Sequence, residues 1–264
     1  MISALRIACA AAAIAVSASV AAEPVRLYAA GSLRSVMTDL GRAWTAGGGG
    51  TIAPEFGPSG TLRDRIVAGA DAQVFASANM EHPRSLAEKG RAGPVSLFAR
   101  NQLCALSTRE ARVTTDTLLE RMLDPAVKVG TSTPKADPSG DYAFLLFEKA
   151  DKLVPGAGAA LAAKALKLTG GPDSPKPPPD RSLYGMLVAG GQADVFLTYC
   201  TNAIVAQRES PSLVVSQVPP SLAVGADYGI TVIAGAPADA AKFVAFVLSP
   251  EGLRIIATHG FALP

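Results

Sequence analysis

Three serines occupy similar places in the chain, at points where a strand-like or loop segment gives way to a helical pattern. Ser32 and Ser59 each follow a strand-like run, and Ser139 immediately precedes a helical pattern. The N-terminus of a helix offers unpaired backbone N–H groups and a partial positive charge, and a serine hydroxyl adds one donor. Such ends bind anions without a formal cation. Serine is a common cap of any helix, but three at the carboxyl ends of strands favour an anion site.

Enzyme chemistry has weak support in the same residues. The segment around Ser59 reads Gly-Pro-Ser-Gly and lacks the second spacing of a nucleophile elbow. We interpret His82 and His259, the two histidines of the chain, as surface or capping residues rather than general bases. We therefore predict no enzyme, no cofactor and no metal site. The alternative is an exported serine hydrolase that uses Ser59 or Ser32, which would lack a histidine partner.

The first 22 residues predict export. Arg6 precedes an apolar run, Ile7–Val16, and the small residues Ser17–Ala22 follow it. This is the pattern of a signal peptide with a cut after Ala22. The run is shorter than the roughly 20 residues that cross a bilayer. A periplasmic protein is the expectation, and an N-terminal helix that stays attached is the alternative.

Composition excludes other classes. The chain has 264 residues, 49% of them hydrophobic and 17% charged, with a formal charge of +2. These values are typical of a globular protein. No basic cluster exceeds a couple of residues, so nucleic acid is not an expected partner. We expect a monomer.

Two cysteines remain once the signal peptide, which contains Cys9, is removed. Cys104 and Cys200 are then the only thiols of the mature chain. In an oxidising compartment such a pair favours a disulfide. Two buried free thiols are the alternative.

Strand-like and helix-like runs alternate along the chain. One example is the helical face of Leu33, Val36, Met37, Leu40 and Trp44, for which Ser32 is the predicted N-cap. Alternation of this kind predicts an α/β fold with a parallel sheet and helices on both faces. We interpret the proline-rich segment 170–180 as a loop within a domain. The predicted strands include Val25–Ala30, Thr51–Phe56, Gln73–Ala76, Ser96–Ser107, Val127–Thr131, Val195–Tyr199 and Tyr228–Ala234, and the predicted helices include Gly140–Lys149, Ala157–Leu168, Ala238–Leu248 and Ser249–Thr258.

Three motifs carry a resemblance to a known family. They are Tyr-Ala-Ala-Gly-Ser-Leu at 28–33, Phe-Gly-Pro-Ser-Gly-Thr-Leu at 56–62, and Gly-Ala-Asp-Ala-Gln-Val-Phe-Ala-Ser-Ala at 69–78. In order and spacing they resemble the periplasmic molybdate-binding proteins of ABC transporters. Pro138–Ala143 and Leu187–Tyr199 resemble later segments of that family.

The resemblance implies a type II periplasmic binding protein fold, with two Rossmann-like lobes and a ligand cleft between them. Lobe I would comprise residues 23–105 and 222–264, and lobe II residues 106–221. The implied ligand is molybdate or tungstate, and the implied partner is an ABC transporter permease. Carried over by position, the ligand-binding residues would be Ser32 and Ser59 from lobe I and Ser139, Arg181 and Tyr199 from lobe II.

The sequence departs from the family pattern at the site. Ser139 replaces a small apolar residue, and Arg181 stands where the family has a valine, so it would pair with an anion directly. Asp141 and Asp180 lie unusually near an anion site and disfavour it unless they point away. A binding protein for another anion or an organic acid read by Arg181 therefore stays open, as does a sensor that docks on a receptor.

In the family fold, the strands that carry Cys104 and Tyr199-Cys200 run near one another. The resemblance therefore implies that the two cysteines come within disulfide reach, with Cα atoms about 4.4–6.8 Å apart.

Overall fold

A computed structural model describes residues 23–176, 178 and 181–264. The predicted signal peptide and Asp180 lie outside these residues. In chain order the elements are β1 (Val25–Ala30), η1 (Gly31–Leu33), α1 (Arg34–Ala46), β2 (Ile52–Gly57), α2 (Ser59–Val67), β3 (Val74–Ser77), α3 (Glu81–Glu88), β4 (Ser96–Ser107), α4 (Leu118–Leu123), β5 (Val129–Ser132), α5 (Pro138–Leu153), α6 (Ala157–Lys164), β6 (Leu166–Thr169), α7 (Leu183–Ala189), β7 (Val195–Tyr199), α8 (Cys200–Glu209), β8 (Val214–Gln217), β9 (Gly225–Val232), α9 (Ala238–Val247) and α10 (Pro250–Thr258).

The strands form one mixed sheet rather than the purely parallel sheet that the alternation predicts. Its order is β2-β1-β3-β9-β4-β7-β5-β6, and β8 pairs with β4 beside this path. β1 runs parallel to β2 and β3, and β5 runs parallel to β6 and β7. β4 and β9 are antiparallel to each other and to their other neighbours. These two strands are antiparallel because one carries the chain out of the first half of the sheet and the other brings it back.

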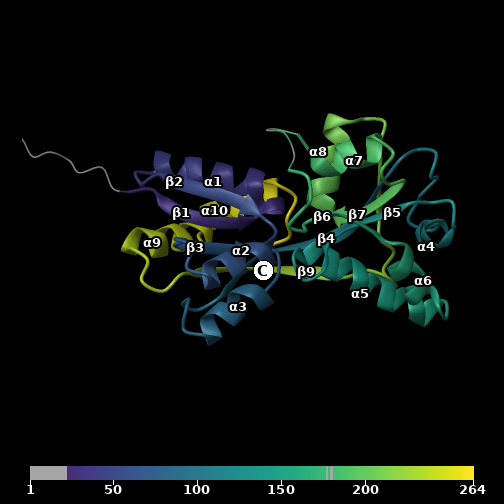
Figure 1. Ribbon diagram of the computed structural model, residues 1–264. Helices are drawn as coiled ribbons and strands as arrows, with labels where there is room; N and C mark the ends of the chain where they lie inside the picture. Colours follow the sequence, from purple (N-terminus) through teal and green to yellow (C-terminus); the bar gives the residue numbers. More distant parts are fainter. Residues whose placement is uncertain (1–22, 177, 179–180) are drawn as a thin grey trace, which may run out of the picture.

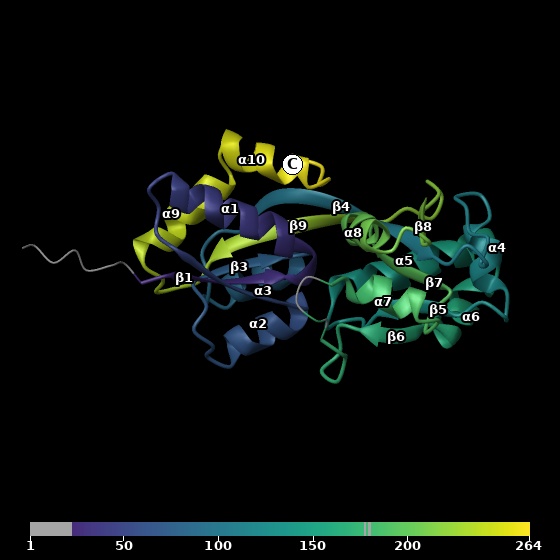
Figure 2. The same cartoon turned by 90° about the horizontal axis from the view of Figure 1, so that it is seen from above.

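The molecule has two lobes, and β4 belongs to both. One lobe holds α1, α2, α3, α9 and α10, and the other holds α4 to α8 (Figure 1). Ser96–Gln102 of β4 pairs with β9, whereas Leu103–Ser107 pairs with β7 and β8. Figure 2 shows β4 and β9 running between the lobes. The change of pairing partners lies slightly before residue 105, the boundary expected from the sequence.

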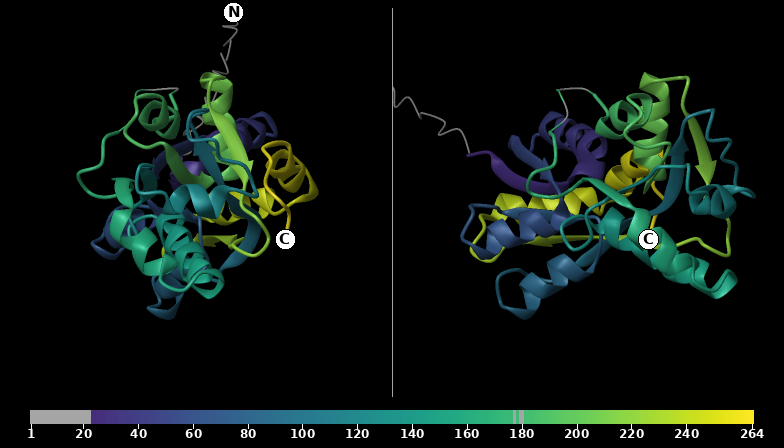
Figure 3. Two further views of the ribbon diagram at one scale, coloured as in Figure 1. Left: turned by 90° about the vertical axis from the view of Figure 1, so that its right-hand side faces the viewer. Right: turned by 45° about the vertical axis from the view of Figure 1, so that its right-hand side comes forward.

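The first lobe closes by packing the two ends of the chain together. Leu33, Val36, Met37 and Leu40 are buried on one face of α1, as predicted. At the end of this face, the Trp44 ring lies 6.0 Å from the ring of Phe243 in α9. α10 contacts α1, which Figures 2 and 3 show as the yellow C-terminal helix beside the purple N-terminal one.

Two local predictions are wrong. Ser32 does not cap α1, because the 3-10 turn Gly31–Leu33 precedes the helix and Leu33 takes the cap position. The alanine-rich helix expected over 157–168 ends at Lys164, and Leu166–Thr169 forms β6. Pairing of β6 with β5 at the sheet edge overrides the helix propensity of this segment.

His82 is buried, whereas the sequence predicts a surface or capping residue. Its side chain is 3% exposed, and its Nδ1 lies 3.2 Å from Nη1 of Arg63. Within the described part of the chain Nε2 has no hydrogen-bond partner. Burial and the neighbouring guanidinium lower the pKa of His82 to about 4.

A disulfide joins the strand that both lobes share to the start of α8. Cys104 lies in β4 and Cys200 begins α8, and their Cα atoms are 4.8 Å apart. The bond therefore attaches the residue after Tyr199 to the strand that both lobes share.

No helix among the described residues is long and apolar enough to cross a membrane.

Reduction of the disulfide is expected to lower the free energy of unfolding. The bond closes a loop across 96 positions, for which the chain-entropy model gives roughly 4–5 kcal/mol. Urea unfolding of oxidised and reduced protein measures the difference, with the Cys104→Ala/Cys200→Ala double variant as a check. Equal unfolding midpoints in all three samples would contradict a stabilising role.

Acid is expected to destabilise the fold through His82. The unfolded chain binds a proton near pH 6.5, whereas the folded chain binds it only near pH 4. Stability is therefore fully present above 6.5 and falls by about 3 kcal/mol as the pH decreases to 4. His82→Gln should lose less stability than wild type between these pH values in urea unfolding. An equally steep loss in His82→Gln would refute this.

Candidate ligand-binding cleft

A cavity of about 1090 Å³ lies between the lobes. Ligand pockets in proteins commonly measure about 300–1000 Å³, so this one is large. Its wall combines serine, tyrosine and glycine residues with several charged side chains. Those that bear on its chemistry are Ser32, Arg34, Glu55, Ser59, Arg65, Ala78, Asp137, Thr169, Lys176, Arg181, Tyr184, Tyr199, Thr201, Glu209 and His259.

The structure brings four of the five predicted ligand residues to this cavity. Ser32, Ser59, Arg181 and Tyr199 line it, and Ser139 does not. The Ser139 hydroxyl is fully buried and donates to Oγ of Ser132 at 2.7 Å. The hydroxyl donor expected at the start of α5 therefore faces the interior of the second lobe.

Ser59 and Tyr199 meet at one peptide segment. The N–H of Ala78 donates to Oγ of Ser59 at 3.1 Å, and the Tyr199 hydroxyl donates to the carbonyl oxygen of Ala78 at 3.2 Å. Because Ser59 accepts this bond, its own hydroxyl proton remains free to point into the cavity. Tyr199 belongs to the second lobe and Ala78 to the first, so the tyrosine contact crosses the cleft.

A chain of hydroxyl and amide groups joins Ser32 and Thr201, two residues that line the cleft. Oγ of Ser32 lies 3.0 Å from the Tyr228 hydroxyl. Nδ2 of Asn101 donates to that same hydroxyl at 3.4 Å and to Oγ1 of Thr201 at 2.9 Å. Burial raises the pKa of both Tyr199 and Tyr228. Both phenols are therefore neutral donors at physiological pH.

Two of the three helix starts that the sequence assigns to an anion are occupied by acceptors from the protein. The Gly60 N–H at the start of α2 donates across the cleft to the Ala136 carbonyl at 2.9 Å. At the start of α5, Asp137 is the N-cap, and its Oδ1 accepts from the Ser139 N–H at 3.1 Å. A ligand at either end must replace or sit beside these acceptors.

Three arginines of the cavity lie next to acidic or aromatic partners. Arg65 is ion-paired with Glu55, and Nε of Arg181 lies 3.6 Å from Glu209. The guanidinium of Arg34 lies 4.7 Å from the centre of the Phe56 ring. Hydroxyl and backbone donors therefore contribute more to the character of the cleft than free cations do. The described residues contain no cluster of histidine, cysteine and acidic residues suited to a metal ion.

Sequence reasoning missed the most unusual member of the wall, Asp137. An Asp-Pro pair at a helix start is a capping signal, so Asp137 and Pro138 could have been assigned as the N-cap and first residue of α5. Asp141, which raised concern in the sequence, is not among the lining residues, and its Oδ1 accepts from the Lys135 N–H at 2.7 Å. No local sequence pattern pointed to Tyr228 or Asn101, because these residues meet only through the pairing of β9 with β4.

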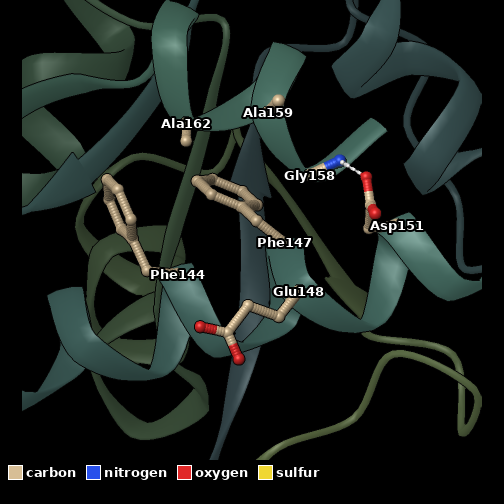
Figure 4. A pocket seen from close by; sticks show the side chains of 7 residues that line it. All are labelled: Phe144, Phe147, Glu148, Asp151, Gly158, Ala159 and Ala162. Carbon is tan, nitrogen blue, oxygen red and sulfur yellow. Dashed lines mark hydrogen bonds between the residues drawn. The ribbon is translucent and has the colours of Figure 1, made fainter. Parts of the chain in front are cut away.

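A second pocket, of about 400 Å³, lies between α5 and α6 (Figure 4). Its wall is mostly apolar and includes Phe144, Phe147 and Ala162. The Asp151 carboxylate accepts a hydrogen bond from the Gly158 N–H of the same pocket wall at 3.0 Å. Without converging donors from two lobes, this pocket is a weaker candidate than the cleft.

The chain is similar to known proteins over most of its length. The family described as bacterial extracellular solute-binding protein matches residues 25–262. An uncharacterized protein of Pasteurella multocida, PM1146, is 37% identical over 206 residues, which cover 77% of this chain and 85% of that protein. The molybdate-binding protein ModA of Mycobacterium bovis is 27% identical over 258 residues, covering 92% and 86% of the two chains.

Solved structures share the two-lobed fold at low identity. The periplasmic molybdate-binding protein of Azotobacter vinelandii aligns with a TM-score of 0.71 and 18% identity, covering 91% of this chain and 99% of that one. The sulfate-binding protein SubI of Mycobacterium tuberculosis aligns with a TM-score of 0.72 and 16% identity, covering 91% and 86%. These structures establish a type II periplasmic binding protein fold.

Close contact of the lobes is expected to depend on Gly60. A Cβ at this position would lie 2.2 Å from the Lys135 carbonyl oxygen and 2.9 Å from that of Ala136. Gly60→Ala should therefore hold the lobes apart, and small-angle scattering should give a larger radius of gyration than for wild type. Gly41→Ala is the control, because its Cβ meets only Ile52 at 3.4 Å. Identical radii for Gly60→Ala and wild type would contradict the contact.

Proposed function

The chain belongs to the family of bacterial extracellular solute-binding proteins, and on that premise we propose that it captures a small oxyanion in the cleft and delivers it to a membrane permease. Molybdate or tungstate is the first candidate, because relatives named for molybdate span most of the chain. The proposed compartment is the periplasm and the proposed partner an ABC transporter, as the resemblance implies.

The observation that carries this proposal is the convergence of neutral donors from both lobes. Ser59 lies in the first lobe and Tyr199 in the second, and both hydroxyls bond to Ala78 at the cavity wall. A desolvated anion needs several hydrogen bonds to offset its lost hydration. Two lobes that each supply part of that shell bind the anion only when they close.

The proposed ligand set follows from the same geometry. Ser32, Ser59 and Tyr199 would donate hydroxyl groups, and Arg181 would add a charged donor from the rim of the cleft. Ser139 would contribute only through Ser132 and Asp137, which its hydroxyl and N–H contact. We therefore propose four of the five predicted residues as direct donors and Ser139 as an indirect one.

A larger organic anion is the second candidate, and the volume of the cleft favours it. A tetrahedral oxyanion displaces only a few water molecules of about 30 Å³ each, whereas the cavity measures about 1090 Å³. The shared fold does not choose between ions, since similar structures are named for molybdate and for sulfate.

A serine hydrolase has no support from the site. His82 contacts Arg63, and Nε2 of His259 lies 3.0 Å from Asp39. Neither contact leads to Ser59 or Ser32, so the serines lack the base that nucleophilic catalysis requires.

Removal of the Ser59 hydroxyl is expected to weaken oxyanion binding by about 1–3 kcal/mol, because a charged acceptor loses one donor. Calorimetric titration of wild type and Ser59→Ala with molybdate, tungstate, sulfate and hydrogen phosphate measures this. Tyr199→Phe should show a loss of the same order. Ser85→Ala is the control, since that hydroxyl bonds to the His82 carbonyl outside the cleft.

Tight binding of one of these anions by wild type, with unchanged affinity in both variants, would refute the ligand set. Failure of all four anions to bind would refute the oxyanion and leave the larger organic anion as the candidate.

A further inference from the structure

Asp137 places a carboxyl group in the wall of the cleft that is proposed to bind an anion. It lines the same cavity as Ser59 and Tyr199. Its Oδ1 accepts from the Ser139 N–H at 3.1 Å, which fixes the side chain at the start of α5. On its other side Gly170 packs so closely that an added Cβ would lie 3.1 Å from Oδ2. The carboxyl is therefore held in place.

The surroundings of Asp137 offer hydroxyl groups but no balancing cation. Ser132, Ser139 and Thr169 form a hydrogen-bonded cluster behind it. Among the described residues, the one charged carboxyl that perturbs its pKa is Asp141 on the same helix, and that effect is upward. Burial is the largest cause, and it also raises the pKa of Asp137.

Three tyrosines from other elements lie near enough for the charge of this carboxyl to affect their pKa values. They are Tyr184 of α7, Tyr199 of β7 and Tyr228 of β9, and the Asp137 charge contributes to the raised pKa of each. Two basic residues also line the cavity. They are Arg181, which is paired with Glu209, and Lys176. His259 also lines the cavity, where it contacts Asp39.

A deprotonated Asp137 and a fully deprotonated oxyanion would repel each other in this partly dry cleft. Two acceptors that share a site do not both stay charged, because one of them binds a proton. The same proton then converts the repulsion into an O–H···O⁻ hydrogen bond, which is short and strong.

We propose that Asp137 shares one proton with the bound oxyanion and thereby sets the specificity of the cleft. This rests on the proposed function. An anion that carries its own proton, such as hydrogen phosphate, brings that proton with it and donates it to the Asp137 carboxylate. An anion that is fully deprotonated at neutral pH, such as molybdate or sulfate, binds only with uptake of a proton from solvent. The affinity for a fully deprotonated anion therefore falls as the pH rises.

The test is calorimetric titration in two buffers with different heats of ionisation, which counts the protons taken up. With molybdate, wild type should take up about one proton per site, and Asp137→Asn should take up none. With hydrogen phosphate, wild type should take up none. Asparagine keeps the N-cap, because it caps helices as well as aspartate does.

The affinities should change in opposite directions. Asp137→Asn should bind molybdate about tenfold more tightly and hydrogen phosphate about tenfold more weakly, the range of one charge-assisted hydrogen bond. Asp116→Asn removes the same charge from an exposed position and should change neither affinity. His259→Gln should keep the proton uptake of wild type, which separates Asp137 from the cavity histidine.

The outcomes separate this inference from the proposed function. Suppose that either anion binds, and that wild type and Asp137→Asn take up equal numbers of protons and have the same affinities. This result would overturn the inference of a shared proton and leave the proposed function intact. Loss of the uptake in His259→Gln would assign the proton to His259 and overturn the inference as well. Failure of every oxyanion to bind would overturn the proposed function, and the inference with it.

Discussion

The sharing of β4 by the two lobes is the constraint on which the cleft depends. The first part of this strand pairs with β9 and the last part with β7 and β8. Each lobe therefore inherits its orientation from a continuous backbone, and relative motion is confined to a bend in the crossing strands. The Cys104–Cys200 disulfide adds a covalent tie at this point. It fixes the start of α8 to β4, so Tyr199 moves with the shared strand.

Several charged side chains of the cleft already have partners of opposite charge within the protein. Arg65 has Glu55, Arg181 has Glu209 and His259 has Asp39 as acidic neighbours. Asp137 is different from these, since hydroxyl groups and one backbone N–H are its partners among the described residues. An unbalanced carboxyl of this kind is costly in a buried place, and a ligand or a proton that neutralises it gains affinity. The proposed site would thus be selective through Asp137 as much as through its donors.

Local sequence patterns predicted the elements of the fold well where a strand or a helical face is apolar on its own. β1, the buried face of α1 and α10 with its Ser249 cap follow from periodicity and capping residues. The mixed sheet did not follow, because the direction of β4 and β9 depends on which lobe the chain leaves. The helix predicted over 157–168 was wrong at its end for a similar reason, since Leu166–Thr169 is a strand only by pairing with β5. At the site, Ser59 and Tyr199 came from motif resemblance, whereas Tyr228 and Asn101 needed the fold.

The direct hydrogen bonds between the lobes and the proposed anion would use the same groups. In this arrangement the Gly60 N–H donates to Ala136 and the Tyr199 hydroxyl donates to Ala78, and both bonds cross the cleft. An anion that accepts from either group must replace a bond that already exists. Its net gain is the difference between a charge-assisted bond and a neutral one, which is smaller than the strength of the new bond. The ligand therefore shifts an equilibrium between open and closed lobes, and the size of the shift depends on how much better its oxygens are as acceptors than two backbone carbonyls.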